Sequence, residues 1–393
     1  MSESLRGVRV IDAATNMAAP YAASILADLG ADVVKVEPPG GEPARAYPPE
    51  VDGMRTQFAA VNHGKRYLVL DLRTEPGREL LHRLAAGADV LIQNVRPGRA
   101  ARLGLDSESC HAANPRLVHA TIAAFHPSDG DRPGYDILVQ GESGLMDQTG
   151  EPDRPPSRIG AAAIDYVSGL WLSIGILAEL RGERDRPTVE VSLLDAAFGL
   201  LNDKVSAFLA TGEAPRRMGA ATSTTTPHGA FPTADGYVVI GTPTDASFGR
   251  LAAVLGPPLE ADARFADQAG RLANRAELER LVSQSLAAQD TEHWLRVLGE
   301  ADLAVGRVAD LSEAVERHGC HSRTGLRAVE GTDRFKVPAP AVSFGDREWG
   351  PLPRPGEPGA DSEAVLADFG LDATEIEELR RAGVVAQPEG AVR

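Results

Sequence analysis

The first 37 residues constrain the fold more than any other part of the chain. They contain an apolar strand at 8–12, a helix at 20–29 that begins with proline, and a second apolar strand at 31–37 that ends in an acid. This order is typical of a parallel βαβ unit in a nucleotide-binding α/β domain. The connecting loop, DAATNMAAPY, nevertheless lacks the Gly-x-Gly-x-x-Gly run that lets a backbone approach a pyrophosphate. The sequence therefore raises the question of what this unit binds.

Strands and helices continue to alternate through the first half of the chain. The predicted elements are strands at 67–72, 89–94, 117–123 and 188–192, and helices at 77–86, 163–180 and 193–210. Helices of about 10–15 residues between strands favour parallel pairing. We therefore predict an α/β fold with a large parallel sheet.

The second half has a different pattern, which predicts an inserted domain. Small polar residues at 219–227 suggest a hinge, a hairpin follows around Asp235-Gly236, and amphipathic helices fill 246–318. Strand patterns and two short helices then return. The predicted division is a large domain that begins with 1–218, a smaller α+β domain at 219–325, and a return to the large domain with C-terminal helices at 326–393.

Composition excludes several classes of protein. Apolar residues make up 43% and charged residues 24% of the 393 residues, as in soluble globular proteins, and the net charge of -16 disfavours nucleic acid as a partner. Cys110 and Cys320 are too few for a disulfide framework. The most apolar run, at 169–180, is shorter than the ~20 residues that a membrane span needs, and the first residues do not resemble an export signal. We expect a cytoplasmic protein without a membrane partner.

Common catalytic and metal-binding motifs are missing from the sequence. The run His318-Gly319-Cys320-His321 has few donors and no second cluster to complete a metal site, so we interpret it as a polar loop and predict no metal. The chain contains no Gly-x-Ser-x-Gly nucleophile motif and no P-loop.

One carboxylate stands apart from the many solvated ones. Asp165 follows the small-residue run Gly160-Ala161-Ala162-Ala163 and opens a long apolar helix. It suits an N-cap, which contributes about 1 kcal/mol to stability. The pattern alone favours this cap. A reactive carboxylate is the alternative, because alanine and glycine admit a substrate closely and apolar surroundings exclude water. With the ordinary aspartate pKa of ~3.9, it is expected to be ionised at pH 7.

The chain resembles the family III CoA-transferases, which include formyl-CoA:oxalate-type transferases, carnitine CoA-transferases and 2-methylacyl-CoA racemases. The resemblance covers nearly the whole chain in order. The segments that carry it include LRGVRVIDAATNMAAPYAASILADLGADVVKVEPPGGEPAR, NHGKRYLVLDLRTEPGRELL, ADVLIQNVRPGRAARLGLD, NPRLVHATI, GYDILVQGESGLMDQTG, PPSRIGAAAIDYVSGLW, VEVSLLDAA, PHGAFPTADGYVVIG and DSEAVLADFGLDATEIEELRRAGVV.

The resemblance implies a fold and a ligand. The expected architecture is a Rossmann-like large domain with an inserted smaller α+β domain, in a homodimer of interlocked rings. The first unit would bind coenzyme A through main chain and apolar walls, which explains the missing glycines. Acyl-CoA and a carboxylic acid would be the substrates, with no tightly bound cofactor.

The resemblance also assigns contacts to CoA by position. The residues implied are Met17, Ala18, Pro20, Leu70, Arg73, Asn94, Val95, Arg102, Leu103 and Tyr135. Arg102 suits a phosphate, because a guanidinium pairs with phosphate oxygens in a bidentate manner. Core packing remains the alternative for Met17, Leu70, Leu103 and Tyr135, and a solvated charge at a helix end remains the alternative for Arg102.

Asp165 matches the nucleophilic aspartate of the transferases, which carries CoA through mixed-anhydride and aspartyl-CoA thioester intermediates. Amides near Gly141 and Gly144 are candidate oxyanion donors. A racemase or epimerase of the same family is the first alternative, but Tyr135-Asp136 replaces the racemase His-Asp pair, and Asp245 is the nearest acid to the position of the racemase glutamate. A non-catalytic CoA-ester binding protein is the second alternative.

Two segments depart from the family pattern. FHPSDGDRPGYD stands where a glycine-rich run is usual, and RGERDRPT replaces a Thr-Gly-x-Gly-Gln turn. The first change shortens and recharges a loop near the expected active site, and both changes bear on acyl specificity.

Overall fold

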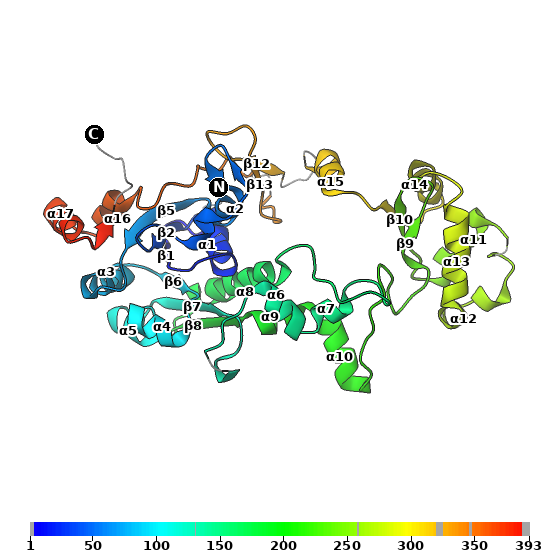
Figure 1. The fold of residues 1–393 in the computed structure, drawn as a ribbon, viewed down its shortest axis with the longest axis horizontal. Coiled ribbons are helices and arrows are strands. Elements are labelled where there is room, and N and C mark those ends of the chain that lie inside the picture. The colour runs from blue at the N-terminus through cyan, green and yellow to red at the C-terminus, as the bar shows by residue number, and fades with distance from the viewer. Residues whose placement is uncertain (1–3, 130, 258, 320–324, 346–347, 387–393) are drawn as a thin grey trace. The chain divides into compact units, whose positions relative to one another are not determined.

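A computed structural model describes residues 4–129, 131–257, 259–319, 325–345 and 348–386 (Figure 1). The chain forms two compact units. The large unit comprises residues 1–145, 159–211 and 320–393, and the small unit comprises residues 146–158 and 212–319. The small unit thus takes in 146–158, a segment that the sequence analysis assigned to the large domain.

A seven-stranded sheet forms the centre of the large unit, in the order β14-β5-β2-β1-β6-β7-β8. All neighbours pair in parallel except β14, which is antiparallel to β5 at the edge. The six parallel strands follow the order of a doubly wound Rossmann sheet. The strands are β1 (Arg9–Asp12), β2 (Asp32–Glu37), β5 (Lys65–Leu70), β6 (Val90–Gln93), β7 (Val118–Ala123), β8 (Thr188–Ser192) and β14 (Val385–Ala386). The predicted α/β fold with a parallel sheet is confirmed.

Both faces of this sheet are covered, because alternate residues of a strand point to opposite faces. Val10 belongs to a core that α1 and α8 complete, whereas its neighbour Ile11 belongs to a second core with α3 and α16. The helices of this unit are α1 (Ala18–Asp28), α2 (Thr56–Asn62), α3 (Glu75–Ala86), α4 (Pro97–Ala100), α5 (Ser107–Ala113), α6 (Asp136–Glu142), α8 (Ala163–Leu180), α9 (Leu193–Leu200), α10 (Asn202–Thr211), α16 (Ser362–Asp368) and α17 (Ala373–Arg381). The helix α7 (Leu145–Gln148) spans the boundary between the units.

Local differences from the predicted elements are small. The helix expected at 193–210 is divided into α9 and α10 at Leu201. Two short antiparallel pairs accompany the large sheet, β3 (Glu50–Val51) with β4 (Met54–Arg55) and β12 (Leu326–Ala328) with β13 (Lys336–Pro338).

The small unit has its own sheet and core. The predicted hairpin is present as β9 (His228–Pro232) and β10 (Tyr237–Gly241), and β11 (Ala304–Arg307), which the sequence analysis did not predict, pairs with β10. Its helices are α11 (Asp245–Leu255), α12 (Gln268–Ala273), α13 (Arg275–Leu286), α14 (Thr291–Glu300) and α15 (Leu311–His318). Phe248, Phe265 and Trp294 are among the buried residues of its core.

Helix α8, which carries Asp165, is long and strongly apolar. By length and composition it passes the test for a membrane span, with a mean hydropathy of 1.4, although a third of it is buried within the protein. A core helix of a soluble protein passes the same test. Leu172 and Ile176 are buried against the sheet, whereas Trp171 and Ile174 are more than half exposed.

Candidate active site

The chain reverses the direction of its crossovers between β1 and β6, and ligands of doubly wound sheets bind outside the carboxyl ends of the strands at such a switch point. Asn94, directly after β6, reaches across to the loop after β1. Its Oδ1 accepts a hydrogen bond from the Thr15 amide at 3.0 Å, and its Nδ2 donates to the Thr15 carbonyl at 2.8 Å. The two loops at the switch point are therefore joined.

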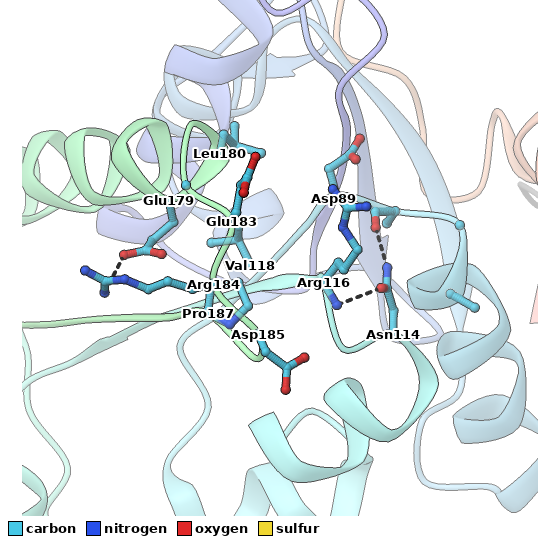
Figure 2. Close-up of a pocket in the computed structure, with 14 residues that line it drawn as sticks. Asp89, Asn114, Arg116, Val118, Glu179, Leu180, Glu183, Arg184, Asp185 and Pro187 are labelled. Carbon is cyan, nitrogen blue, oxygen red and sulfur yellow. Dashed lines mark hydrogen bonds and ion pairs between the residues drawn. The ribbon is translucent and has the colours of Figure 1, made fainter.

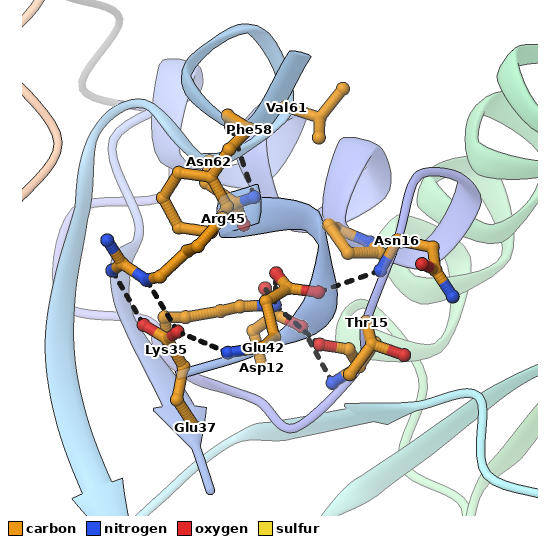
Figure 3. A network of polar contacts seen from close by, with 12 residues as sticks. Asp12, Thr15, Asn16, Lys35, Glu37, Glu42, Arg45, Phe58, Val61 and Asn62 are labelled. Atoms are coloured by element: carbon orange, nitrogen blue, oxygen red, sulfur yellow. Dashed lines mark hydrogen bonds and ion pairs between the residues drawn. The ribbon is translucent and has the colours of Figure 1, made fainter. Parts of the chain in front are cut away.

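A buried ionic network holds the loop after β1 through its backbone groups (Figure 3). Lys35 Nζ donates to the Ala14 carbonyl at 2.5 Å and lies 3.0 Å from Glu42 Oε1. Glu42 Oε2 accepts from the Asn16 amide at 2.8 Å, and Asn16 has a φ of 69°, in the left-handed region. The loop thus keeps an unusual backbone shape because opposite charges hold successive backbone groups.

Asp12 at the end of β1 is the second anion of this network. It accepts from Lys65 Nζ at 2.8 Å and from the Ala14 amide at 3.0 Å. Burial pushes the pKa of Asp12 up, but Lys35 and Lys65 outweigh burial and lower it. Burial lowers the pKa of Lys65 to about 8, against the attraction of Asp12. The charged side chains of the network are buried, so they shape the loop without contacting a ligand bound outside it.

The start of α1 lies against α8. Met17 is the partly buried N-cap residue of α1, and Ala18 and Pro20 are buried in its first turn. A Cβ placed on Gly169 of α8 would come 2.6 Å from the Ala18 carbonyl oxygen. The rings of Tyr21 and Tyr166 meet edge to face, with centroids 4.9 Å apart. Three predicted CoA contacts therefore lie beside the helix that carries Asp165.

Asp165 is the third residue of α8, and the N-cap position belongs to Ala162, which has no side-chain cap. The cap comes instead from α6, where Asp136 Oδ2 accepts from the Ile164 amide at 2.9 Å and from the Asp165 amide at 3.4 Å. The interpretation of Asp165 as an N-cap is therefore wrong. Across the described residues, the Asp165 carboxylate makes no hydrogen bond or ion pair of its own.

The electrostatics of Asp165 also differ from expectation. Burial and the nearby charge of Asp136 raise the pKa of Asp165 to about 7. The expectation that this carboxyl group is simply ionised at pH 7 is therefore wrong. The cause is that few polar groups solvate a carboxylate in this partly enclosed position, and the nearest charge has the same sign. A carboxylate of raised basicity is a better nucleophile once deprotonated.

The other predicted residues fall into two groups. Leu70 is buried in the core beneath α3, and Val95 and Leu103 pack against the same core. Three side chains face solvent. Arg73 forms an ion pair with Asp71 of its own loop, Arg102 is exposed in the short 3-10 segment Ala101–Leu103, and Tyr135, at the start of α6, is 63% exposed.

The proposed oxyanion donors gain no support. The Gly144 amide donates weakly to the Gly141 carbonyl at 3.4 Å, within the α6 terminus. Gly141 itself lies inside α6.

A cavity of about 810 Å³ lies elsewhere in the large unit (Figure 2). Its walls include Asp89, Val118 and Pro187 at the amino ends of β6, β7 and β8, and Glu179 in the last turn of α8. Fourteen positions separate Glu179 from Asp165, or about 21 Å along a helix. None of the predicted site residues lines this cavity.

Among the described residues, no group of three histidine, cysteine or acidic side chains is arranged to hold a metal. Cys320 and His321 of the polar loop lie outside those residues. Cys110 is a free, buried thiol, and burial raises its pKa to about 12.

Comparison with known proteins agrees with this geometry. The profile of CoA-transferase family III matches residues 5–362. The chain belongs to CoA-transferase family III. It is 34% identical to the acetyl-CoA:oxalate CoA-transferase of Acetobacter aceti, over 91% of this chain and 93% of that protein. It is also 34% identical to the succinate–glutarate CoA-transferase of Agrobacterium fabrum, over 94% and 97%. A CaiB/BaiF family structure from Brucella suis superposes with a TM-score of 0.82 at 33% identity, over 94% of this chain and all of that one.

Several polar side chains that shape the candidate site of this family III protein were not predicted from its sequence. Lys35 and Glu42 shape the loop after β1, and a lysine within the apolar strand DVVKVE was a usable signal, because buried lysines are nearly always paired. Asp136 caps α8 with the help of Gln140, and their i,i+4 spacing was the corresponding signal on α6.

The recharged loop of this family III protein is anchored rather than free. The Arg132 guanidinium lies over the Phe125 ring at 4.1 Å and donates to Glu142 Oε1 at 2.5 Å. Arg96, after β6, donates to the Asp131 carbonyl at 3.0 Å. These contacts fix the segment that leads to Tyr135 and Asp136.

Proposed function

We propose that the chain moves CoA from an acyl-CoA donor to a carboxylic acid acceptor, with Asp165 as the covalent carrier. One observation carries this proposal. A carboxylate with no hydrogen bond among the described residues stands at the start of α8, one helical turn before Gly169, and Gly169 packs on Ala18, the first residue of α1 after the loop that follows β1. The nucleophile and the CoA-binding loop thus belong to one packed unit.

The proposed reaction has four nucleophilic displacements, and an acyl group stays activated as a thioester or an anhydride throughout. An Asp165 carboxylate oxygen attacks the thioester carbon, the C–S bond breaks, and CoA thiolate leaves a mixed anhydride. The thiolate then attacks the Asp165 carbonyl carbon and releases the donor acid, which forms aspartyl-CoA. The acceptor carboxylate displaces thiolate to give a second anhydride. Thiolate finally attacks the acceptor carbonyl, which yields the new thioester and restores Asp165.

Placement of the groups supplies most of the rate in this proposal. Well-oriented attack contributes about 7–11 kcal/mol, more than the 3–4 kcal/mol of one oxyanion donor. The pKa of about 7 leaves a large fraction of Asp165 deprotonated near neutral pH while raising its basicity. Tyr135 in place of a histidine base favours transfer over racemisation, because two-face proton exchange needs a second proton carrier.

The proposed CoA path runs over the switch point. Met17, Ala18 and Pro20 would meet the nucleotide, with Asn94 shaping the loop, and Arg102 would pair with a phosphate. Leu70, Val95 and Leu103 would form or support the apolar wall, and Arg73 would contribute from its loop. Tyr135 would line the path of the pantetheine.

We also propose a homodimer in the cytoplasm. The large unit exposes large apolar side chains on α8, α9 and α10, and exposed apolar surface favours contact with a partner. The most exposed of them on α8 and α10 are Leu170, Trp171, Ile174, Phe208 and Leu209, and α9 adds Phe198 and Leu200.

The test is to trap the intermediate. The enzyme is incubated with acyl-CoA, quenched with hydroxylamine or borohydride, and digested for mass spectrometry. A modification on Asp165 that is absent from Asp165→Ala supports the proposal. An unmodified Asp165, or full turnover of Asp165→Ala, overturns it.

Two controls distinguish the alternatives. Solvent deuterium entering the α-carbon of the acyl group, without any acceptor acid, would indicate a racemase. CoA-ester binding without exchange of label between acyl-CoA and free acid would indicate a binding protein.

A further inference from the structure

Asp136 gives the start of α8 a cap that the helix does not supply itself. The first turn of a helix has amides without intrahelical partners, and an N-cap side chain normally accepts from the second or third of them. Here Asp136 Oδ2 accepts from both, the amides of Ile164 and Asp165. The cap therefore comes from a different helix.

Gln140 fixes the side chain of Asp136. Its Nε2 donates to Asp136 Oδ1 at 2.5 Å, and its Oε1 accepts from the Ile159 amide at 2.9 Å. Asp136 and Gln140 are both buried. The pair thus binds the chain on both sides of the small-residue run at 160–163, and sets where that run ends and the helix starts.

The consequence for Asp165 follows from its position. A carboxylate in the first turn of a helix is attracted to the amides of that turn that have no intrahelical partner. Asp136 occupies the amides of Ile164 and Asp165, so neither is left for the Asp165 carboxylate, which makes no hydrogen bond among the described residues.

We propose that Asp136 is a positioning residue, whose carboxylate keeps Asp165 turned outward for attack on the thioester. This inference rests on the proposed function. It adds a residue that touches the nucleophile's backbone rather than the substrate. Gln140 takes part by holding Asp136 in place.

The charged and titratable groups around Asp165 allow the role of Asp136 to be measured through the pH at which Asp165 loses its proton. Asp136 faces it from α6. Tyr166 is its neighbour on α8, with a pKa that burial and Asp165 raise, and Tyr21 of α1 packs on Tyr166. Replacing the Asp136 carboxylate by an amide removes a like charge while leaving an acceptor oxygen. The deprotonation of Asp165 should then occur at lower pH.

The test compares wild type, Asp136→Asn and Asp136→Ala by rapid mixing with acyl-CoA and quantification of trapped Asp165 from pH 5 to 9. Asp136→Asn should fold and shift the pH midpoint of trapping downward. Asp136→Ala should slow trapping by about 10- to 100-fold with little change in KM, because a small misplacement of a nucleophile has that effect.

The matched control is Asp106→Asn. Asp106 caps α5 by accepting from the Ser109 amide at 2.9 Å, so it is also a capping carboxylate, but away from Asp165. This variant should keep the wild-type rate and pH midpoint. Gln140→Leu, which releases Asp136 without touching α8, should move kcat in the same direction as Asp136→Ala.

The outcomes separate the two proposals. If wild type forms no adduct on Asp165, the proposed function itself fails, and the positioning role with it. If wild type forms the adduct and folded Asp136→Asn shows an unchanged rate and pH midpoint, the positioning role alone is overturned. Should Asp136→Ala fail to fold, Asp136→Asn and Gln140→Leu still decide.

Discussion

The Gly169 Cα of α8 faces the Ala18 carbonyl oxygen of α1 with no room for a side chain, since a Cβ would lie 2.6 Å from that oxygen. The two helices therefore meet backbone to backbone. Gly169 lies four residues after Asp165, on the same helical face. The first turn of α1, which is proposed to bind CoA, and the proposed nucleophile are consequently held at a fixed spacing.

Gly169→Ala should separate these helices. We expect a loss of about 1–3 kcal/mol in the free energy of unfolding, because a methyl group is forced into a packed backbone contact. We also expect a fall in kcat. The control is Gly249→Ala in α11, where a Cβ has nothing within 4 Å, and which should gain up to about 1 kcal/mol. Chemical denaturation and steady-state kinetics measure both, and equal effects at the two positions would contradict the packing argument.

Much of this arrangement could be predicted from sequence, because the parallel sheet and α8 have strong local patterns. The bounds predicted for α8, 163–180, agree with those observed. Strand β14 was not predicted, because its two residues are a strand only through pairing with β5. Local signals do not encode such a partner, which is distant in sequence.

The candidate site shows the same limit. Asp165 was identified from its neighbours, but its environment depends on Asp136, twenty-nine positions earlier in the chain. The N-cap interpretation failed because it considered only the helix that Asp165 belongs to. The raised pKa of Asp165 likewise follows from burial and from the Asp136 carboxylate, which is close in space but distant in sequence, so the local sequence does not reveal it.

Asn94→Ala should weaken acyl-CoA binding specifically. The change removes both hydrogen bonds to Thr15, so the loop after β1 loses its link across the switch point. We expect KM for acyl-CoA to rise about tenfold, as for the loss of one to two hydrogen bonds at about 1 kcal/mol each. Steady-state kinetics at varied acyl-CoA measure it.

Asn114→Ala is the matched control for this change. Asn114 Nδ2 donates to the Ala85 and Ala88 carbonyls, beside the cavity at the other end of the sheet (Figure 2). Its loss should lower stability to a similar extent and leave KM unchanged. A rise in KM for both variants would mean that Asn94 acts only through global stability.

Arg102→Ala should reveal whether this exposed guanidinium pairs with a CoA phosphate. KM should rise about tenfold or more for acyl-CoA, because charge-assisted hydrogen bonds are the stronger kind. The rise should be much smaller for the acyl ester of 3′-dephospho-CoA, if the 3′-phosphate is the partner. Arg73→Ala, which removes a guanidinium already paired with Asp71, is the comparison. Equal effects on both esters would exclude a role for Arg102 at that phosphate.

Asp165→Asn should stabilise the protein in a pH-dependent manner. The pKa of Asp165 is about 7 in the folded protein against an ordinary value of 3.8, so the folded chain retains a proton that the unfolded chain has lost between these values. Ionisation of Asp165 therefore lowers the free energy of unfolding as pH rises from about 4 to 7, and this loss is complete above pH 7. The Asn variant removes this penalty. Its Tm should exceed that of wild type at pH 8 and approach it near pH 4.

Asp106 supplies a control for that experiment, because its pKa is shifted in the opposite direction. Burial pushes the pKa of Asp106 up, but hydrogen bonds from Ser109 outweigh burial and lower it. Its stabilising contribution is therefore present above its ordinary pKa and lost as pH falls. Asp106→Asn should lower Tm at pH 8 and approach wild type in acid. Thermal scans of both variants from pH 4 to 9 make the comparison. If Asp165→Asn were to lower Tm at pH 8 as Asp106→Asn does, Asp165 would be a stabilising structural carboxylate, and its assignment as a carboxylate that destabilises the fold when ionised would be wrong.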